Sequence, residues 1–492
     1  MREMRGFDVI IIGGGITGLT AGVGLSGEGR RVALIEAEAH LGGRAASYID
    51  EETGVTVDIG PHIFFSEYPN MLKLLSILGT EDRVVWQKGS IARVFLRHNK
   101  FIEYTPDKRL PPPLHFLPLI FGDNTLSFSS KLSHIRAIKR IMELTEGDVA
   151  ELDKVDAETW LVEMGVDEEA RNGFWNFASM AIMNVPLERA SAGALMRFVH
   201  RIVGRNDYTI GFASGGLSNL FAPGAAERIE RGGGMVIVGS AVKRIEIKGG
   251  VFHKVVTESG DDYFAPICIS TIPLPYLSAV LPPELTAIGG EFDYLSSFEP
   301  SPYKSVYIWF DRKITDMQFW ARWLGDDYLN LDFYDISNIN ADLEGCGSIV
   351  TSNIIYSRRV DGYSDEKIVE RTIKEIADTI PAVNGAEVEH WRVHNIPMAI
   401  HCPYPGTEVL RPGIETGIGG LFIAGDFSRT ALPTSMESAA RAGWMAAEKA
   451  LKHFGVNRKL SVESSPDMGI VAFFSGREKR RMKEGGRPDC ND

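Results

Sequence analysis

Cysteine is scarce in this sequence, with four residues among 492. Cys268, Cys346, Cys402 and Cys490 form no CxxC pair and have the spacing of neither a zinc site nor a disulfide framework. The sequence therefore predicts no metal centre and no disulfide scaffold, and it indicates a protein of a reducing compartment.

Positive charge is also in short supply, because 52 lysines and arginines stand against 65 aspartates and glutamates, which leaves a net charge of -13. Binding to nucleic-acid phosphates requires Lys and Arg side chains clustered on one face. We therefore expect no nucleic-acid partner, and a small molecule as the ligand.

Long hydrophobic runs are missing as well. A membrane-spanning helix needs about 20 consecutive apolar residues. Only the stretch from Val9 to Leu25, behind the basic start Met1 to Arg5, comes near this length. Glycines interrupt it and no clear cleavage site follows, which disfavours a signal peptide. We expect a cytoplasmic protein that is at most peripherally associated with a membrane.

The most informative motif lies close to the N-terminus. An apolar strand, Phe7 to Ile12, leads into Gly13, Gly15 and Gly18 and then into a helix of small residues. Gly13 permits a tight turn, Gly15 lets a pyrophosphate approach the backbone, and Gly18 lets helix and strand pack closely. The N-terminus of this helix then faces the phosphates.

A second strand, Arg31 to Ile35, follows and ends at Glu36. An acid about 20 residues after such glycines binds ribose hydroxyls in dinucleotide-binding folds. Because a carboxylate at this position repels a 2'-phosphate, the motif predicts a bound adenine dinucleotide and disfavours NADP.

The length of the chain and its 44% hydrophobic content predict two intertwined domains. We expect an α/β fold with a discontinuous, Rossmann-like nucleotide-binding domain and a second, mixed α+β substrate domain that includes a helical insert from 127 to about 205. The expected boundaries are 1–90, 209–275 and 410–456 for the first domain, 91–208 and 276–409 for the second, and 457–492 for a C-terminal tail.

Local patterns mark further elements. Ala92 to Tyr104 is typical of a hairpin that turns at residues 98–100. Asn70 to Gly79 is typical of an amphipathic helix with Gly79 as its C-cap. A short buried strand, Leu421 to Ala424, ends at Gly425 and Asp426, and a helix follows whose capping box we expect to be Thr434 with Glu437.

Together, five motifs resemble the superfamily of FAD-dependent amine oxidases and carotenoid desaturases. In chain order they are Gly13 to Gly18 with Glu36, Gly42-Gly43-Arg44, Asp58 to Phe65 before Tyr68-Pro69-Asn70, Ile308 to Lys313, and Gly425-Asp426 through Ser435-Met436-Glu437. The elements His62 to Phe65, Ile308 to Lys313 and Arg411-Pro412 are most similar to plant-type phytoene desaturases and hydroxysqualene dehydroxylases, which act on long isoprenoids.

The resemblance implies a noncovalently bound FAD. It places Arg44 against the phosphates and flavin, His62 beside the flavin, Val242 against the adenine, and Asp426 at the pyrophosphate or ribityl hydroxyls. For His62, a purely structural histidine remains an alternative. The full implied cofactor-binding set is Gly13, Gly15, Ile16, Thr17, Gly18, Glu36, Gly42, Gly43, Arg44, Gly60, Pro61, His62, Val242, Gly425, Asp426, Ser435, Met436 and Glu437.

The chain also departs from the pattern. Pro61 stands where the family often has a small apolar residue, and Ser435 stands where amine oxidases place an aromatic residue of their amine cage. Cys402 lies where some amine oxidases attach flavin, but its spacing and its neighbour Pro403 favour an inert cysteine. Lys304 aligns approximately with a catalytic lysine of amine oxidases, and a solvated lysine is an equal alternative.

The expected reaction is the desaturation or dehydrogenation of a long apolar isoprenoid, with hydride transfer to flavin N5. Phe64, Phe65, Tyr68 and the run Leu114 to Phe121 are expected to line an apolar tunnel, with ordinary core packing as the alternative for each of them. A flavin amine oxidase, a protoporphyrinogen-oxidase-like enzyme, and a non-enzymatic protein similar to the Rab GDP-dissociation inhibitors stay open as other functions.

A quinone or oxygen is the expected electron acceptor. Peripheral membrane contact is also expected, from the segment Leu110 to Phe121 and from the apolar stretch Ile470 to Phe474 with the basic residues that follow it. These basic residues are Arg477, Lys479, Arg480, Arg481 and Lys483.

Overall fold

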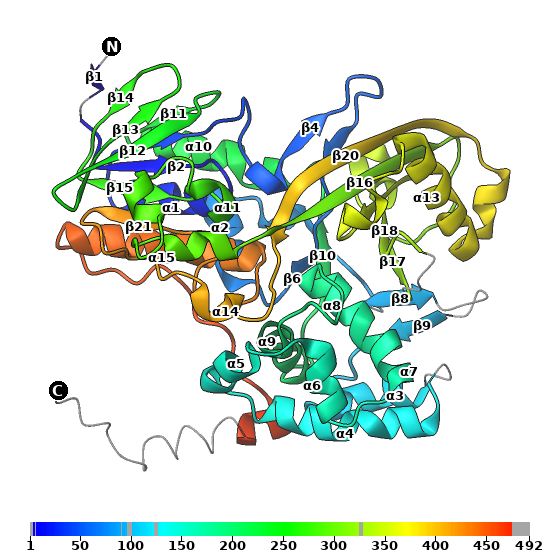
Figure 1. The fold of residues 1–492 in the computed structure, drawn as a ribbon. Helices are drawn as coiled ribbons and strands as arrows, with labels where there is room; N and C mark the ends of the chain where they lie inside the picture. Colours follow the sequence, from blue (N-terminus) through cyan, green and yellow to red (C-terminus); the bar gives the residue numbers. More distant parts are fainter. Residues whose placement is uncertain are drawn as a thin grey trace.

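The computed structural model describes residues 3–4, 6–89, 91–95, 101–122, 126–323 and 328–474. Three lobes are visible in Figure 1: a sheet-and-helix lobe that contains the N-terminus, a lobe built on a long, mostly antiparallel sheet, and a helical lobe below them. The long strands β16 and β20 run from the first lobe into the second. The predicted α/β class is confirmed, with helices and several sheets along one chain.

The first lobe is built on a five-stranded sheet in which all neighbouring strands are parallel. Its order is β11-β3-β2-β15-β21. The strands come from distant parts of the chain: β2 (Val9–Ile12), β3 (Val32–Ile35), β11 (Met235–Ile237), β15 (Ile267–Ser270) and β21 (Leu421–Ile423). Every residue of β2, β3 and β15 is buried, as expected for a parallel sheet that is covered on both faces.

Helix α1 (Ile16–Gly27) packs on this sheet between α10 (Ala222–Arg231) and α15 (Met436–His453). Small residues allow the helices to approach as closely as this packing requires. A Cβ at Gly22 would lie 2.5 Å from Ile229 Cδ1, and one at Gly443 would lie 2.5 Å from the Thr17 carbonyl oxygen. The glycines of α1 therefore serve helix packing as well as the turn that precedes the helix.

Smaller sheets surround this layer. One of them has the order β1-β14-β13-β12, with β1 (Glu3–Met4), β12 (Val242–Lys248), β13 (Val251–Thr257) and β14 (Asp262–Tyr263). Two further sheets border the second lobe: β4 (Ser47–Ile49) with β5 (Thr56–Asp58), and β6 (Phe64–Phe65), β10 (Ile210–Ala213) and β7 (Val84–Trp86).

The second lobe is a seven-stranded sheet of order β20-β16-β19-β18-β17-β8-β9. One face, which carries Val306, Ile308 and Phe310, packs against helix α13 (Asp365–Thr379). The opposite face lies against the residues that follow β5. The strands are β8 (Ala92–Phe95), β9 (Phe101–Tyr104), β16 (Pro300–Phe310), β17 (Phe319–Arg322), β18 (Asp332–Asp335), β19 (Ile349–Ile354) and β20 (Val388–His401). β8 and β9 pair as the predicted hairpin, whose turn at residues 98–100 lies outside the described residues.

The helical insert has its own hydrophobic core, which includes Trp160, Trp175 and Leu195. Its helices are α4 (Phe128–Met142), α5 (Glu146–Leu152), α6 (Ala157–Glu163), α7 (Glu168–Ala170), α8 (Asn176–Met183) and α9 (Ala192–Val203), with a π-helical turn at Arg171–Trp175. The remaining α-helices are α2 (Pro69–Leu78), α3 (Leu117–Gly122), α11 (Leu274–Leu277), α12 (Pro283–Thr286) and α14 (Thr407–Leu410). Gly79 caps α2 with φ +71°, as predicted.

One expectation about the last part of the chain was wrong, and the first part of the expected tail is packed. The N-cap of α15 is Ser435, whose Oγ accepts from Ser438 N at 3.2 Å, so the expected capping box of Thr434 with Glu437 does not form. The segment 457–474 is not a free tail. Val462 N donates to Asn70 Oδ1 at 2.8 Å, and Val471 is fully buried. Within the described ranges, no helix is long and apolar enough to cross a membrane.

Candidate active site

The glycine turn before α1 has the shape that the sequence predicts. Gly13 has φ +106°, and a Cβ there would lie 2.3 Å from Thr271 Oγ1. A Cβ at Gly18 would lie 1.9 Å from the Gly13 carbonyl oxygen. Around Gly15, by contrast, the nearest described atom to such a Cβ is the Gly42 carbonyl oxygen at 4.0 Å. Gly13 and Gly18 are thus required by close packing, whereas the space beside Gly15 is open.

A second glycine turn lies directly beside the first one. Gly42 and Gly43 both have positive φ, +114° and +56°, and Gly42 N donates to the Gly14 carbonyl at 2.9 Å. The first N–H groups of α1, including those of Ile16 and Thr17, have no partner within the helix and carry its partial positive charge. The Thr17 side chain is committed elsewhere, because Oγ1 donates to the Ala439 carbonyl at 3.0 Å. Only the backbone of Thr17 lies next to the open space beside Gly15, between the two glycine turns, and this space is called the groove.

Glu36 closes one end of this groove. Its Oε2 accepts from Gly14 N at 2.6 Å and its Oε1 accepts from Glu38 N at 2.9 Å, and the residue is 9% exposed. Each oxygen retains capacity to accept a further hydrogen bond. The backbone of Glu36 also binds Ile237 and Ser240, which brings the start of β12 and Val242 to the same end. Val242 is partly buried against the cluster that contains Ile12 and Ile35.

Arg44 and Asp426 meet at the other end of the groove. The guanidinium binds the carboxylate in a fork, with Nη1–Oδ2 at 2.9 Å and Nη2–Oδ1 at 2.8 Å, and Nη1 also donates to the Ala399 carbonyl at 3.0 Å. Burial alone would raise the pKa of Asp426, but the charge and hydrogen bonds of Arg44 hold it below its usual value. Asp426 is therefore an anion at neutral pH, and it orients Arg44, whose side chain is 32% exposed.

The loop after β5 brings Gly60, Pro61 and His62 to the seven-stranded sheet. His62 Nδ1 lies 2.8 Å from the Gly60 carbonyl, and burial lowers the pKa of His62, so its imidazole is neutral at pH 7. Asn353 Nδ2 donates to the Pro61 carbonyl at 3.3 Å. A Cβ at Gly60 would lie 3.3 Å from Ile396 Cδ1, so Gly60 lets the loop approach the sheet.

The carboxylate of Glu437 is bound to the start of α2. Its carboxylate accepts from Asn70 Nδ2 at 2.6 Å, from Asn70 N and from Met71 N at the start of α2. Burial raises the pKa of Glu437 to about 7, although these hydrogen bonds act in the opposite direction. At the N-terminus of α15, only the backbone of Met436 and Glu437 is left to bind a ligand, while Ser435 Oγ caps the helix.

Lys304 lies on the face of β16 that packs against helix α13, away from the loop of Gly60 to His62. Its Nζ donates to Asn395 and lies 4.0 Å from Asp365 Oδ1 at the start of α13, on the face that packs against that helix. Side chains alternate along a strand, so Ser305 occupies the opposite face. A Cβ at Gly60 would lie 4.0 Å from Ser305 Cβ. Ser305 therefore stands on the sheet face next to Gly60, and Lys304 stands on the face that packs against α13.

The aromatic residues that were expected to line a tunnel divide into two groups. Phe64 is fully buried in the core with Met71 and Leu74 and is ordinary core. Phe65 is only partly buried and packs against the cluster of Ile210, Phe212, Phe319 and Tyr334, between β6–β10 and the seven-stranded sheet. Partly buried Ile63, Tyr104, Phe177 and Trp323 pack against the same cluster.

Other members of the expected tunnel are placed differently. Tyr68 packs with the nucleotide-domain core, Phe116 stacks on Tyr104 with ring centroids 5.7 Å apart, and Leu117 is 39% exposed. The side chains of Leu119 and Phe121 lie outside the described residues. Cys402 is fully buried in the helical core with a raised pKa, which fits the inert cysteine that the sequence predicts.

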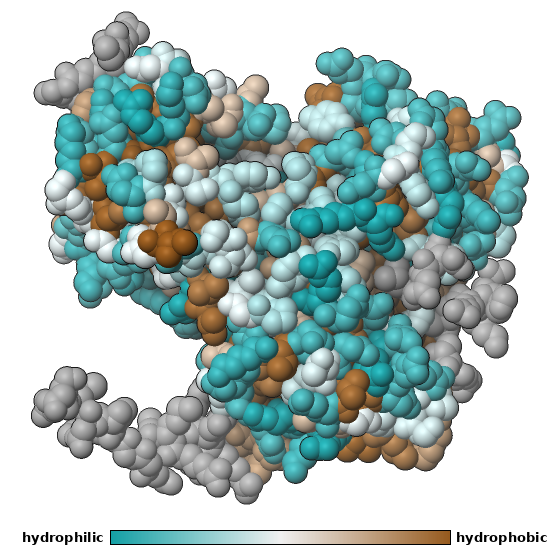
Figure 2. Space-filling model, in the orientation of Figure 1, coloured by the Kyte–Doolittle hydropathy of each residue, from teal (hydrophilic) through white to brown (hydrophobic). Residues whose placement is uncertain are grey.

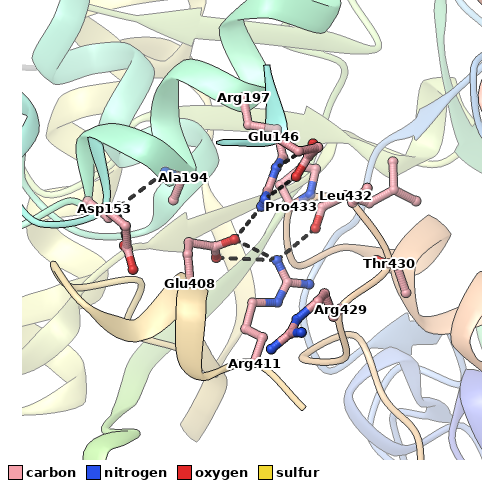
Figure 3. Close-up of polar contacts among 12 residues, drawn as sticks. Glu146, Asp153, Ala194, Arg197, Glu408, Arg411, Arg429, Thr430, Leu432 and Pro433 are labelled. Atoms are coloured by element: carbon pink, nitrogen blue, oxygen red, sulfur yellow. Dashed lines mark hydrogen bonds and ion pairs between the residues drawn. The ribbon is translucent and has the colours of Figure 1, made fainter. Parts of the chain in front are cut away.

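A buried charge network holds the loop between β21 and α15 (Figure 3). Arg411 is 1% exposed and binds both oxygens of Glu408, at 3.2 and 3.1 Å. Glu408 also pairs with Arg197, which binds Glu146 at 2.7 Å. The other N–H groups of Arg411 donate to the carbonyls of Asp426, Phe427, Ser428 and Leu432.

This network determines the conformation of the loop that carries Asp426. Burial would raise the pKa of Glu408, but Arg411 and Arg197 together hold it below its usual value. The sequence pointed to Arg411 only through the pair Arg411-Pro412. Glu408 and Arg197 lie far apart in the sequence, and their pattern gave no sign of a pair.

The residues of the two glycine turns, Glu36 and the start of α15 suit a bound FAD. Two side-chain-free turns and unpaired helix N–H groups suit a pyrophosphate, the carboxylate of Glu36 suits a ribose diol, and the N-terminus of α15 suits an electron-rich ring edge. Within the described part of the chain, no group of three His, Cys, Asp or Glu could hold a metal ion.

Comparisons with known proteins agree with an FAD-binding site. Residues 16–451 match the family of flavin containing amine oxidoreductases. The 15-cis-phytoene desaturase of Solanum lycopersicum is 24% identical over 472 residues, which cover 92% of this chain and 79% of the relative. The 15-cis-phytoene desaturase of Synechococcus elongatus is 24% identical over 458 residues, covering 89% of this chain and 95% of the relative.

Solved structures share the fold. Putrescine oxidase bound to putrescine aligns with a TM-score of 0.70 at 15% identity, covering 92% of this chain and 99% of that one. Cyclohexylamine oxidase from Brevibacterium oxydans aligns with a TM-score of 0.68 at 18% identity, covering 92% and 100%. The chain belongs to the flavin containing amine oxidoreductase family, within the superfamily of amine oxidases and carotenoid desaturases, and is an FAD-dependent oxidoreductase rather than a non-enzymatic binding protein.

Proposed function

We propose that this oxidoreductase desaturates or dehydrogenates a long apolar isoprenoid. The observation that carries the proposal is the partly buried aromatic and aliphatic surface between β6–β10 and the seven-stranded sheet, which includes Ile63, Phe65, Phe177 and Trp323. Burial of each substrate methylene contributes about 0.8 kcal/mol, so a long chain is held without an ionic anchor. The phytoene desaturases that are similar over nine-tenths of the chain support this substrate class.

The chain's own residues would hold FAD in a defined order. The two glycine turns and the first turn of α1 bind the pyrophosphate, Glu36 binds the ribose next to the adenine, and Val242 lies against the adenine. Arg44, fixed by Asp426, lies near the phosphates and ribityl chain, and His62 and the N-terminus of α15 border the ring. When bound, FAD accepts a hydride from a C–H bond of the substrate.

An amine substrate is the main competing proposal, because the structural neighbours include a putrescine oxidase and a cyclohexylamine oxidase. Ser435 argues against it. Its side chain is small and caps α15, so the aromatic half of an amine cage expected at this position is missing. A likeness to these structures below one-fifth sequence identity supports the fold and leaves the substrate open to experiment.

Anaerobic mixing tests the proposal. Phytoene-like and squalene-like substrates are expected to bleach the flavin absorbance, and simple primary amines are not. Phe65→Asp should suppress this reduction while FAD is retained, because an unpaired carboxylate then lies in the apolar surface. Phe65→Leu is the matched control and should stay close to wild type. Rapid reduction by amines, with none by any isoprenoid, would move the chain to the amine oxidase branch. Reoxidation by a quinone or by oxygen, measured afterwards, identifies the acceptor.

We also propose that the helical lobe contacts a membrane surface. Phe128, Leu132 and Ile135 lie on one face of α4 and are 67%, 45% and 62% exposed. Figure 2 shows hydrophobic side chains along the lower edge of the molecule, where Figure 1 places α4. The helix has several basic residues and no acidic one, unlike the chain as a whole. A basic amphipathic helix with exposed aromatic and aliphatic residues suits an anionic lipid surface.

The C-terminal segment, which was also predicted to contact a membrane, is described only up to residue 474. Within the C-terminal segment, Ile470 and Phe473 are exposed, whereas Val471 is buried. The basic residues from Arg477 to Lys483 lie outside the described residues. Their contribution is tested with a chain that ends at residue 474, because an earlier truncation would remove the packed segment.

A further inference from the structure

One face of the seven-stranded sheet carries a row of polar side chains next to the loop of Gly60 to His62. Ser305 on β16 pairs with Asn353 on β19. The antiparallel register of β18 with β19, in which Tyr334 pairs with Thr351, places Asp332 opposite Asn353. Directly opposite residues have Cβ atoms about 5 Å apart. Because Asn353 Nδ2 binds the Pro61 carbonyl at 3.3 Å, the row begins at the loop and reaches Asp332 one strand further on.

Each member of this row has a polar atom that lacks a partner. Ser305 Oγ, Asn353 Oδ1 and Asp332 Oδ1 are buried, and none of them forms a hydrogen bond with any residue that the structure describes. Leaving one such atom unpaired costs about 1–3 kcal/mol. Three adjacent unpaired atoms beside the loop of Gly60 to His62 indicate a surface that meets a ligand rather than the protein core.

Asp332 is the charged member of the row, and no Lys, Arg or His among the described residues forms an ion pair with it. Its Oδ2 accepts from Tyr334 OH at 2.9 Å, and the other titratable group that faces it is Tyr303 on β16. Among the described residues, no Lys, Arg or His contributes to the pKa of Asp332. Burial raises this pKa to about 6, against the lowering effect of the Tyr334 hydroxyl and the backbone N–H of Asn353.

The described neighbours of Asp332 on the adjoining elements are uncharged. Ala321 on β17 is its cross-strand neighbour, Phe177 of α8 packs against the cluster that contains Tyr334, and Tyr303 packs against the cluster that contains Met180 of α8. At neutral pH the carboxyl group is therefore mostly ionised and stands as a lone anion among aromatic rings. An anion without a counter-charge stabilises positive charge that develops next to it.

We propose that Asp332 is the catalytic base of the desaturation. The proposal rests on the proposed function. The substrate loses a hydride from one carbon to the flavin and a proton from the adjacent carbon to Asp332 Oδ1. The electron pair of the second C–H bond forms the new double bond. The proton then passes to solvent, and the two electrons pass from the flavin to the quinone or oxygen acceptor.

The position explains why the row is polar within an apolar surface. Departure of the hydride leaves positive charge on the substrate, which the carboxylate and the faces of Tyr303 and Tyr334 stabilise. A carboxylate that titrates near pH 6 is a stronger base than an ordinary aspartate and is still ionised at pH 7. The Tyr334 hydroxyl keeps it so, because it donates a hydrogen bond to the charged form.

The first test compares Asp332→Asn with Glu389→Gln, which neutralises an exposed acid of the same sheet. Both variants are expected to retain FAD. Flavin reduction by the active isoprenoid should fall by about 100-fold or more in Asp332→Asn and stay unchanged in Glu389→Gln. In wild type, the rate should rise with pH through about 6. Tyr334→Phe removes the hydrogen bond that stabilises the anion, so this rise should move to higher pH.

Two measurements do not depend on turnover. The infrared carboxyl band that titrates near pH 6 in wild type should be missing in Asp332→Asn. Dimethylfarnesylamine, a protonated mimic of a cationic isoprenoid, should bind wild type at least about tenfold more tightly than Asp332→Asn, as measured by calorimetry. Farnesene, the neutral counterpart, should bind both proteins equally. If Asp332→Asn does not fold, the wild-type band and the Tyr334→Phe shift still decide the question.

The outcomes separate the two proposals. If no isoprenoid reduces the wild-type flavin, the proposed function fails and the base assignment falls with it. If isoprenoids reduce wild type and Asp332→Asn at equal rates, or the Tyr334→Phe profile does not move, the base assignment alone is overturned. Reduction by amines that is lost in Asp332→Asn overturns both proposals and makes Asp332 an ammonium-binding residue.

Discussion

Replacing Arg411 with methionine tests whether the buried charge network holds the loop that carries Asp426. The substitution keeps an unbranched apolar stem and removes the guanidinium. Four carbonyls, those of Asp426, Phe427, Ser428 and Leu432, then lose a donor. An unpaired buried acceptor costs about 1–3 kcal/mol, so with water entering the hole the four carbonyls cost about 4 kcal/mol.

The cost of breaking the ion pair between Arg411 and Glu408 is of similar size. Removing one partner of a buried pair costs about 3–5 kcal/mol, and Arg197 remains beside Glu408 to limit the loss. We therefore expect the free energy of unfolding of Arg411→Met to fall by about 4 kcal/mol, a large part of the 5–15 kcal/mol typical of a protein. Because the loop carries Asp426 and precedes α15, FAD should also dissociate more readily.

Urea unfolding, followed by tryptophan fluorescence and by the release of flavin fluorescence, measures both effects. Arg429→Met is the matched control, since Arg429 lies in the same loop, is exposed, and donates to the Val409 carbonyl at 3.2 Å (Figure 3). It should cost less than about 1 kcal/mol. An Arg411→Met protein as stable as Arg429→Met would refute the reasoning, because the network would then contribute nothing to the loop.

Three further predictions concern the cofactor and the membrane. Gly15→Val fills the open space beside Gly15 and should abolish FAD retention while the fold persists, as judged by flavin absorbance and circular dichroism; full retention would defeat the assignment of the pyrophosphate site. Glu36→Ala should weaken FAD by about 1–3 kcal/mol in titration, and an unchanged affinity would show that the carboxylate does not meet the ribose. Ile135→Ser should reduce co-sedimentation with anionic liposomes by about tenfold, whereas Ile288→Ser, which changes an exposed isoleucine elsewhere, should not; equal binding of both variants would remove α4 from the contact.

The parts of the fold that follow from local patterns could be predicted from the sequence. The strand, glycine turn and helix at residues 7–27 need only nearby residues, and their geometry matches the expectation. The same holds for the glycine that caps α2. In each case a short segment contains both the signal and the partner that satisfies it.

Features that depend on partners distant in the sequence could not be predicted. The carboxylate of Glu437 binds the N-terminus of α2, which lies far away in the sequence. Lys304 and Ser305 are neighbours on β16 and point to opposite faces of the sheet. A shift of one residue in the register exchanges these two faces. Asp332 gave one weak signal, an acid in the apolar run from Leu331 to Tyr334, whose meaning depends on which strands lie beside it.

The order of strands in the parallel sheet has a consequence for synthesis. The sheet needs β21 at residues 421–423, and α1 needs α15, which ends at His453. These contacts close only after nearly the whole chain has left the ribosome. Until then the apolar faces of β2, β3 and β15 lack their final cover, a state that favours aggregation and slow folding of non-local contacts. Cells that make this protein therefore need chaperone capacity in proportion to its rate of synthesis, and nonsense variants that stop before residue 421 should be insoluble rather than merely inactive.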